Sequence, residues 1–420
     1  MNENYITKIY IDKVRNLKDI TIELSDSEKK HLILTGKNGS GKTSVLSAVK
    51  SYLKSIEENQ YLTLINIDTD IQNLKIQSKD TNFINSLSES ERTRYIERGK
   101  GNLSFYENLK FRYGEGLKLF LKDDNLLEKY KQGKFILAYF DAHRMTSVEI
   151  PSGVEKINLL NTYDMDSRPS SSFIKYLVDL KTQQAFAQNE DDVEVFKKIE
   201  GWFQRFEDSL KILMDDTTLK LKFDYKNYNF EIMQEDKEPY SFDKLSDGYS
   251  SVLNIIMDLI LRMENNKREI YDVEGIVLID EIETHLHLEL QKKIMSFLTG
   301  FFPKLQFIVT THSPFVLNSI DNAVIYDLEK NIKVEDLSNY SYEGIVEGYF
   351  NVDKYSKDIK NKLKEYEDLV NKRDLTDDER ARRSELKIEL KEISSELAVE
   401  LKLKFEEIEM KRANLYDKDK

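Results

Sequence analysis

Hydrophobic residues alternate with polar ones along the first part of the chain. The segments YITKIYIDKV (5–14) and KDITIEL (18–24) have the period of two that is typical of half-buried strands, and KHLILTG (30–36) is more continuously apolar. The pattern becomes helical from Thr43 to about Lys54. These residues therefore predict three strands followed by a helix.

From residue 55 to residue 218 the chain is polar and rich in Lys, Glu, Asn and Gln. This stretch predicts a mainly helical insertion that contains one clear strand, KFILAYF, at 134–140. Strands are predicted again at 219–225 and 228–234, which are close enough in the sequence to form a hairpin.

Two nearly continuous apolar segments, GIVLID (275–280) and LQFIVTT (305–311), follow an apolar helix that is predicted at 250–263. Such runs are typical of parallel strands that are covered on both faces. The segments 323–329 and 331–337 are predicted to complete the sheet. The fold class predicted from this pattern is α/β.

Residues 346–420 predict a hairpin of two helices, and the second helix begins with a capping box formed by Thr376 and Glu379. The apolar positions are Ile359, Leu363, Tyr366 and Val370 on the first helix and Leu386, Leu390, Ile393, Leu397, Leu401, Phe405 and Ile408 on the second. This apolar stripe has two interpretations. Residues 355–412 bind a partner protein, or the stripe packs on the rest of the chain or between its own two helices.

Composition narrows the classes of function. The 420 residues include no Cys, which excludes disulfides, thiolate metal sites and cysteine nucleophiles. The formal net charge of −13 argues against a protein that coats nucleic acid, so DNA is kept only as a partner of a local basic groove. No signal peptide or membrane-spanning run is recognisable. We therefore expect a soluble, cytoplasmic protein without a membrane partner.

The segment GKNGSGKT (36–43) matches the G-x-x-x-x-G-K-[ST] pattern of a phosphate-binding loop, with an apolar strand before it and a helix after it. The glycines let backbone amides face the phosphates, Lys42 supplies a positive charge, and Thr43 supplies a hydroxyl to Mg²⁺. The sequence therefore predicts that ATP and Mg²⁺ bind here. The residues expected to contact them are Gly36, Asn38, Gly39, Ser40, Gly41, Lys42, Thr43 and Ser44.

Asp280 and Glu281 stand at the carboxyl end of a predicted strand, the edge where ligands bind in open α/β sheets. Asp280 is predicted to hold Mg²⁺, and Glu281 to take a proton from the water that attacks ATP. An Asp-Glu pair in this place is also a common helix cap, but the phosphate loop favours the catalytic interpretation. His312, which ends the next strand, is suited to contact the γ phosphate.

His285 and His287 look like a metal-binding pair. They are two residues apart on a segment that is predicted to be helical, and side chains at this spacing diverge. Metal binding by this pair is therefore not expected.

The segment LSDGYS (245–250) opens the apolar helix with Ser246 and Gly248. Ser and Asp are common at the start of a buried helix because their side chains accept hydrogen bonds from free backbone amides. The same free amides and the positive end of the helix dipole bind phosphate well. The segment alone leaves both interpretations open.

The order of these motifs along the chain resembles that of the ABC-type ATPase heads of the SMC, RecF and OLD proteins. The resemblance implies a P-loop ATPase head with a mixed sheet, a mainly helical insertion and a C-terminal helical hairpin. It also implies that Ser246 and Gly248 contact the γ phosphate held by a second subunit. Asp280 and Glu281 correspond to the Walker B pair, and His312 to the switch histidine.

Two further positions follow from the same resemblance. The segment VRNLKDITIEL resembles the family's Phe-Arg-Asn opening, with Val14 in place of Phe and Arg15 in the position of the Arg that contacts the nucleotide. The family's Q-loop glutamine has no clear counterpart, and Asp141 and Arg144 in YFDAHRM are the nearest candidates.

The chain resembles most the ATPase subunits of bacterial antiphage defence systems, of the Septu PtuA or AriA type. This implies a homodimer or higher homo-oligomer that senses or regulates beside a separate effector, for which a nuclease is expected. The alternative is a RecF-like DNA-repair ATPase, which a basic groove and ATP-dependent binding to DNA ends would favour. The expected division is 1–54 and 219–345 for the ATPase head, 55–218 for the insertion and 346–420 for the hairpin.

Overall fold

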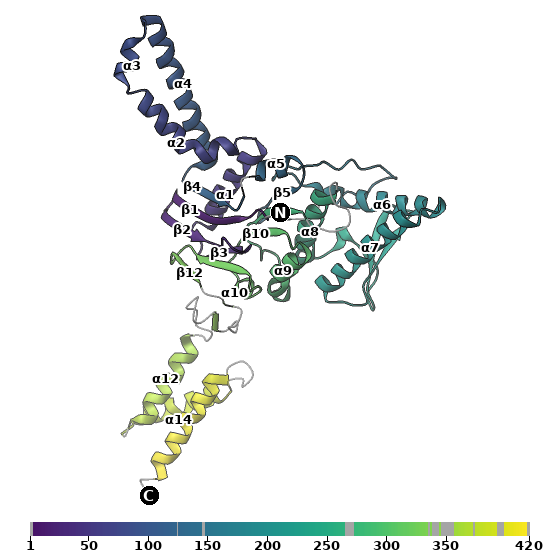
Figure 1. The fold of residues 1–420 in the computed structure, drawn as a ribbon. Coiled ribbons are helices and arrows are strands. Elements are labelled where there is room, and N and C mark those ends of the chain that lie inside the picture. The colour runs from purple at the N-terminus through teal and green to yellow at the C-terminus, as the bar shows by residue number, and fades with distance from the viewer. Residues whose placement is uncertain are drawn as a thin grey trace. The chain divides into compact units, whose positions relative to one another are not determined.

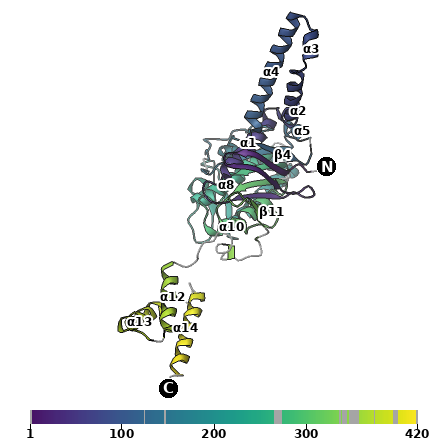
Figure 2. The ribbon, with the colours of Figure 1, turned by 90° about the vertical axis from the view of Figure 1, so that its left-hand side faces the viewer.

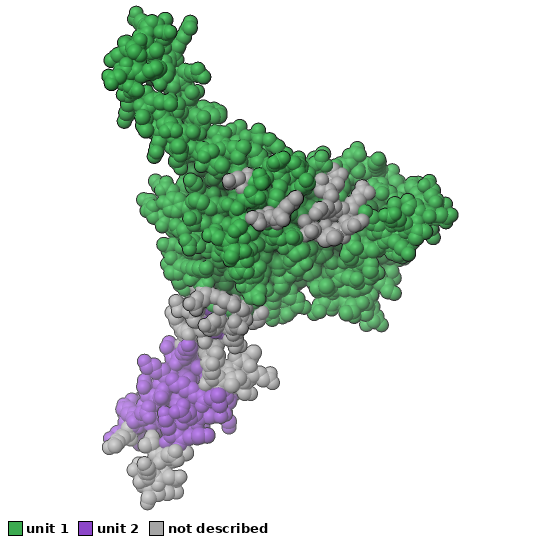
Figure 3. Space-filling model, in the orientation of Figure 1, with its two compact units in different colours: residues 1–339 green, residues 340–420 purple. Residues whose placement is uncertain are grey.

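The structure is a computed structural model. It describes residues 3–123, 125–144, 148–264, 273–334, 337, 344–345, 357–372, 374–392 and 399–417. The chain divides into two compact units, which are residues 1–339 (unit 1) and residues 340–420 (unit 2) (Figure 3).

A six-stranded sheet forms the centre of unit 1 and joins strands from distant parts of the chain (Figure 1). Its order is β12 (Ile332–Val334), β11 (Ala323–Asp327), β3 (His31–Thr35), β10 (Leu305–Thr310), β9 (Glu274–Ile279) and β5 (Phe135–Phe140). The five strands from β11 to β5 are parallel, and β12 pairs antiparallel with β11. The predicted α/β class with a mixed sheet is therefore confirmed.

A second, antiparallel sheet has the order β2 (Leu17–Glu23), β1 (Ile6–Val14) and β4 (Leu117–Leu121). Helix α1 (Lys42–Glu57) contacts both β10 of the central sheet and β1 and β4 of this one. One hydrophobic core joins the three layers, with Ile9 from β1, Val49 from α1 and Ile308 from β10 among its buried members. The helix that starts at the phosphate loop is thus fixed between two sheets.

Strand β4 is not predicted by the sequence pattern, because it is only five residues long and lies between helical segments. It begins after a turn at Gly116, whose φ is +71°. A Cβ atom on Gly116 would lie 1.9 Å from the carbonyl oxygen of Lys13, so only glycine fits where this turn crosses β1. Residues 55–218 therefore contribute strands to both sheets, β4 to one and β5 to the other.

Three helices after α1 form an arm that projects from the rest of unit 1 (Figures 1 and 2). They are α2 (Tyr61–Gln77), α3 (Thr81–Ser86) and α4 (Glu89–Gly114), and the short α5 (Leu126–Lys131) follows β4. Ser88 and Glu91 form a capping box that starts α4. Helix α4 packs along α2 and contacts α1, so the base of the arm adjoins the phosphate-loop helix.

The rest of unit 1 contains a helix pair, a small sheet and the helices that follow it. They are η1 (Pro169–Ser172), α6 (Phe173–Asn189), α7 (Val193–Met214), β6 (Lys220–Asp224), β7 (Asn229–Met233), β8 (Tyr240–Ser241), η2 (Phe242–Lys244), α8 (Asp247–Glu264), α9 (Leu288–Phe301) and α10 (Pro314–Leu317). The predicted hairpin is confirmed as β6 and β7, and β8 adds a third strand. Every residue of α8 from Ser251 to Glu264 is buried, as the continuous apolar pattern predicts.

The described part of unit 2 contains three long helices where the sequence predicts two. They are α12 (Lys357–Asn371), α13 (Asp377–Lys391) and α14 (Val399–Asp417), and the predicted capping box of Thr376 and Glu379 starts α13. Lys387 of α13 forms an ion pair with Glu409 of α14. In one straight helix these residues would be about 33 Å apart, so the predicted second helix is wrong as a single element. Ile393 and Leu397 lie outside the described residues.

The apolar stripe of unit 2 is covered by the unit itself. Its buried core consists of Leu363, Tyr366, Val370, Leu386, Leu390, Leu401, Phe405 and Ile408. The interpretation that the stripe packs between its own helices is therefore the correct one, with three helices in place of two. Because these side chains are already buried, the stripe gives no argument for a docking surface, and partner binding by residues 355–412 stays a prediction. Among the described helices, none has both the length and the hydrophobicity needed to cross a membrane.

Candidate nucleotide site

The phosphate loop connects β3 to α1 at the carboxyl edge of the central sheet. Gly36, Gly39 and Gly41 have φ angles of +131°, +83° and +98°, which side chains disfavour. A Cβ atom on Gly36 would lie 2.9 Å from Ser40 Oγ, and one on Gly41 would lie 3.0 Å from Leu17 Cδ1. All three glycines are thus needed for the path of the loop, and Gly36 and Gly41 are needed for its packing as well.

Lys42 is buried inside the loop. Its Nζ donates hydrogen bonds to the carbonyl oxygens of Gly36, at 2.8 Å, and Lys37, at 3.1 Å. Burial lowers the pKa of Lys42, and the carboxylates of Glu283, Glu281 and Asp280 act in the opposite direction. The loop therefore holds a partly desolvated cation close to three acidic residues.

The two predicted magnesium ligands meet at one point. Thr43 Oγ1 donates a hydrogen bond to Asp280 Oδ1 at 3.2 Å, although the residues are 237 positions apart. Thr310 Oγ1, at the end of β10, donates to the same oxygen at 2.5 Å. The adjacent ends of β9 and β10 and the start of α1 thus orient the carboxylate of Asp280.

Glu281 has a φ of +44°, a left-handed conformation that is uncommon for this residue type. Its backbone N–H donates to Thr310 Oγ1 at 2.7 Å, and its Oε2 accepts a hydrogen bond from Thr284 Oγ1 at 3.3 Å. The side chain of Thr310 therefore holds the unusual backbone of Glu281, and Thr284 in the same turn orients its carboxylate.

Glu283 belongs to the site but is not predicted by sequence reasoning. Its Oε2 accepts a hydrogen bond from Thr311 Oγ1 at 2.7 Å, and its Oε1 accepts one from the backbone N–H of His312 at 2.6 Å. Burial and the neighbouring charge of Lys42 lower the pKa of His312, so the imidazole is neutral at pH 7. The sequence does show an acidic residue two positions after Glu281. It does not show that the partners of this residue, Thr311 and His312, follow a different strand.

Ser246 and Gly248 open α8 and make no described hydrogen bond with the phosphate loop of the same chain. Ser246 is exposed, and its carbonyl oxygen accepts the N–H of Ser250 at 2.9 Å. A Cβ atom on Gly248 would lie 2.9 Å from the carbonyl oxygen of His285. Gly248 therefore has a packing role within one chain, and the exposed Ser246 is free to face another molecule.

The prediction that His285 and His287 lie on a helix is wrong. Both are exposed in a series of turns before α9, which starts at Leu288, and His285 has a φ of +66°. The backbone bends here because the turn packs against Gly248, which the apolar periodicity of the segment did not indicate.

Asp141 and Arg144 follow β5 at the same edge of the sheet. Asp141 Oδ1 accepts the backbone N–H of His143 at 2.9 Å, and Asp141 Oδ2 lies 3.5 Å from Arg168 Nη2. Arg144 is buried and donates to the backbone of the Asp280–Ile282 segment. The two candidates for the Q-loop position thus have different surroundings.

Arg15 is exposed in the β1–β2 turn, with a φ of +51°. Leu17, the first residue of β2, packs against Gly41, so the turn that carries Arg15 adjoins the phosphate loop. Asn38 is exposed on the loop, and Ser44 is half-buried in the first turn of α1.

The residues at this edge fit a nucleotide with Mg²⁺. Ser40 Oγ is buried and has no hydrogen-bond partner among the described residues, which suits a group that a phosphate oxygen would meet. The hydroxyl of Thr43 and the carboxylate of Asp280 are oxygen ligands of the kind that Mg²⁺ takes together with water and phosphate oxygens.

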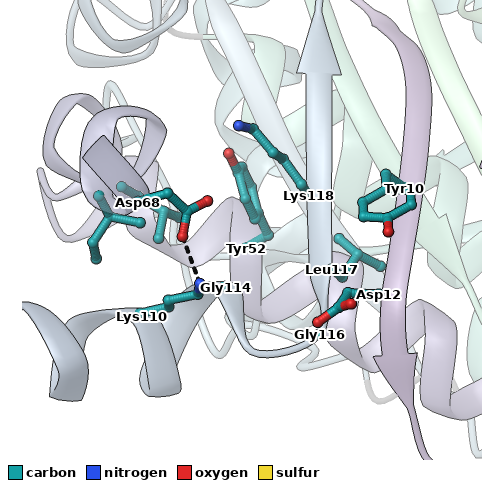
Figure 4. A pocket seen from close by; sticks show the side chains of 11 residues that line it. Tyr10, Asp12, Tyr52, Asp68, Lys110, Gly114, Gly116, Leu117 and Lys118 are labelled. Carbon is teal, nitrogen blue, oxygen red and sulfur yellow. Dashed lines mark hydrogen bonds and ion pairs between the residues drawn. The ribbon is translucent and has the colours of Figure 1, made fainter. Parts of the chain in front are cut away.

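A separate pocket of about 150 Å³ lies at the base of the arm, between α1, α2, α4, β1 and β4 (Figure 4). Its lining includes the ion pair of Asp68 with Lys110, at 2.5 Å, and the buried Tyr52, whose hydroxyl has no described hydrogen-bond partner. None of the predicted site residues lines this pocket.

Comparisons with known proteins give the family. Residues 32–318 match the family described as "AAA domain, putative AbiEii toxin, Type IV TA system". The chain is 26% identical over 364 residues to the Septu protein PtuA of Bacillus mycoides (strain KBAB4). This alignment covers 83% of this chain and 45% of that protein. It is 23% identical over 382 residues to the Retron Vc95 probable ATPase of Vibrio cholerae serotype O1 biovar El Tor. This alignment covers 74% of this chain and 72% of that protein. The chain thus spans about half the length of the first relative.

Among solved structures, the SMC head domain from Thermotoga maritima is similar, with 13% identity, a TM-score of 0.34, and coverage of 77% of this chain and 94% of that one. The family match includes the phosphate loop, Asp280 and Glu281, and it confirms the predicted resemblance. Because the match extends over more than half of its residues, the chain belongs to this family of AAA-domain, ABC-like P-loop ATPases.

Proposed function

We propose that the chain binds ATP with Mg²⁺ and hydrolyses it at the edge formed by the phosphate loop, β9 and β10. The hydrogen bond between Thr43 and Asp280 carries this proposal, because it brings the loop and the acidic pair to one point. Lys42 would contact the phosphates, and Thr43 and Asp280 would hold Mg²⁺. Bound Mg²⁺ would neutralise phosphate charge, and Glu281 would take the proton of the attacking water.

We also propose that two copies share their ATP sites. Ser246 is exposed at the start of α8 and makes no described hydrogen bond with the phosphate loop of its own chain, which leaves it for the nucleotide of a second copy. His312 would contact the γ phosphate from the loop's own chain, where a neutral imidazole beside Lys42 fits.

The biological setting proposed is a bacterial antiphage system. Two relatives are named as a Septu protein and a retron ATPase, and most of this chain aligns with each of them. We propose that this chain is the sensor or regulatory ATPase and that a separate effector, with a nuclease as the expected type, performs the attack. No docking surface is assigned, because the stripe of unit 2 is buried.

Replacement of Lys42 tests ATP binding. Lys42→Ala should weaken the binding of Mg²⁺-ATP about 10- to 150-fold, because loss of a charge-assisted hydrogen bond costs ~1.5–3 kcal/mol. Isothermal titration calorimetry measures the affinity. The control is Lys37→Ala, in the same loop, whose exposed side chain pairs with Glu329. An unchanged affinity of a folded Lys42→Ala chain would contradict the proposed site.

A further inference from the structure

Arg144 is 4% exposed and lies behind the turn that carries the acidic pair. Its Nη1 donates to the carbonyl oxygen of Asp280 at 2.6 Å, and its Nη2 donates to those of Glu281, at 2.9 Å, and Ile282, at 3.2 Å. Nη1 also donates to the carbonyl oxygen of Asp141 at 2.9 Å. One guanidinium therefore binds three consecutive carbonyl groups of the turn.

The fifth hydrogen bond of Arg144 leads to another element. Its Nε donates to Ser251 Oγ at 3.2 Å, and Ser251 lies in the second turn of α8, five residues after Ser246. All five acceptors are uncharged, and no carboxylate lies within ion-pair distance in the described part of the chain. Burial lowers the pKa of Arg144 to about 10, so the side chain is charged at neutral pH.

A buried cation that is not directly paired with a carboxylate is costly. The carboxylates of Glu283, Asp141, Asp280 and Glu281 offset part of this cost from a distance, because they raise the pKa that burial lowers. The turn offers a compensating role, because Glu281 has a φ of +44° and a backbone in this region persists only when its surroundings hold it. Five N–H groups in a rigid fork can hold several carbonyl oxygens in fixed positions, which the single ammonium group of Lys cannot.

We propose that Arg144 is a positioning residue that fixes the Asp280–Glu281 turn and connects it to the start of α8 through Ser251. This inference rests on the proposed function, in which Asp280 holds Mg²⁺ and Glu281 acts on the attacking water. A shift of about 1 Å in a positioned catalytic group costs on the order of 100-fold in rate. A movement of the start of α8, which carries Ser246, would therefore be transmitted to Asp280 and Glu281 through the side chain of Arg144.

The test compares Arg144→Met, Arg144→Lys and Ser251→Ala with the unaltered chain. Arg144→Met should lower kcat about 100-fold and raise the Mg²⁺ concentration for half-maximal ATP binding about 10-fold, while ATP affinity at saturating Mg²⁺ stays within ~3-fold. Arg144→Lys should recover only part of kcat, and Ser251→Ala should lower kcat a few-fold. The control is Arg262→Met, which removes another buried arginine of unit 1 that donates to backbone carbonyls and, unlike Arg144, also pairs with a buried carboxylate, Asp258, at 2.5 Å. It should lower the melting temperature and leave the Mg²⁺ requirement unchanged.

An Arg144→Met chain with normal kcat and Mg²⁺ requirement would overturn the proposal. So would a loss of kcat, ATP affinity and melting temperature that matches Arg262→Met, because Arg144 would then be structural only. If Arg144→Met does not fold, Ser251→Ala and Arg144→Lys decide by the same measurements. Absence of hydrolysis by the unaltered chain contradicts the proposed function instead, and the Mg²⁺ requirement for ATP binding still tests Arg144.

Discussion

His31 begins the central strand β3 as a buried, uncharged acceptor. Its Nδ1 accepts the backbone N–H of Phe307 on β10 at 3.0 Å. Burial, with smaller contributions from Lys29 and Lys30, lowers the pKa of His31 from 6.5 to about 3. Between about pH 3 and pH 6.5, His31 is therefore protonated in the unfolded chain and neutral in the folded chain. The stability that neutral His31 contributes is therefore complete above pH 6.5 and is lost as the pH falls toward 3.

The variant His31→Asn keeps an acceptor oxygen near the position of Nδ1 but does not titrate. Between pH 6 and pH 4 the free energy of unfolding of the unaltered chain should fall by up to about 1.4 kcal/mol per pH unit more than that of the variant. Urea unfolding followed by Trp202 fluorescence measures this, because Trp202 is the one Trp of the chain and is buried in unit 1. The exposed His287→Asn is the control and should keep the slope of the unaltered chain. Equal slopes for His31→Asn and the unaltered chain would contradict the prediction.

Sequence reasoning finds residues whose chemistry is set by a local motif. Lys42 and Thr43 are recognisable because the loop requires these residue types at fixed spacing. Glu283 and Thr310 were missed, and Arg144 was named only as a candidate for the Q-loop position, because each acts through a partner on another segment of the chain. Their contacts depend on the order of strands in the sheet, which no local spacing specifies.

At the scale of elements, periodicity predicts the long, strongly apolar segments and fails where tertiary contacts decide. Strands β9 and β10 and helix α8 occur where the apolar runs predict them. Strand β4 was missed because its pairing with β1 defines it more than its own five residues do. The helices α13 and α14 were merged because the apolar spacing continues from one helix to the next.

The core of unit 2 can be tested through Leu386, which is fully buried between the three helices. Leu386→Ala should lower the free energy of unfolding of unit 2 by ~2–5 kcal/mol, because the truncation leaves a cavity. Urea unfolding followed by far-ultraviolet circular dichroism should show an earlier transition for part of the helical signal. The transition seen by Trp202 fluorescence should not move, since Trp202 lies in unit 1.

The control for this prediction is Ile388→Ala, two residues further along α13, where the side chain is 63% exposed. Its effect should stay within about 0.5 kcal/mol. Similar losses for both variants, or none for Leu386→Ala, would show that the helices do not pack through this face.

At the scale of the whole molecule, one chain holds the parts of the proposed site in two places. The phosphate loop, Asp280 and Glu281 meet at one edge of the sheet, and the exposed Ser246 makes no described bond with them. In a two-fold symmetric dimer each ATP site would combine the loop of one copy with Ser246 of the other. The sequence predicts this arrangement only through the family resemblance, because no pattern within one chain specifies which surfaces of two copies meet.

Mixing two inactive variants tests the shared site. Ser246→Arg should bind ATP with normal affinity, because its own loop is intact, but should not hydrolyse it, because the long cation blocks the partner's nucleotide. Lys42→Ala should fail for the opposite reason. In a mixed dimer, the loop of the Ser246→Arg chain meets the unaltered Ser246 of the Lys42→Ala chain, so one of the two sites is complete. Random pairing makes half of the dimers mixed, and an equal mixture should therefore recover about a quarter of the normal ATPase rate.

The matched control is Ser86→Arg, which places the same cation on an exposed serine of the arm and should leave hydrolysis unchanged. Light scattering of the unaltered chain should show an ATP-dependent increase in mass, which Ser246→Arg abolishes because the composite site cannot close. If Ser246→Arg alone hydrolyses ATP at the normal rate, Ser246 only starts a helix. If both variants are inactive alone and their mixture is inactive as well, hydrolysis does not depend on one loop paired with the opposite Ser246. The site would then lie within one chain, and the exposed position of Ser246 would need another cause.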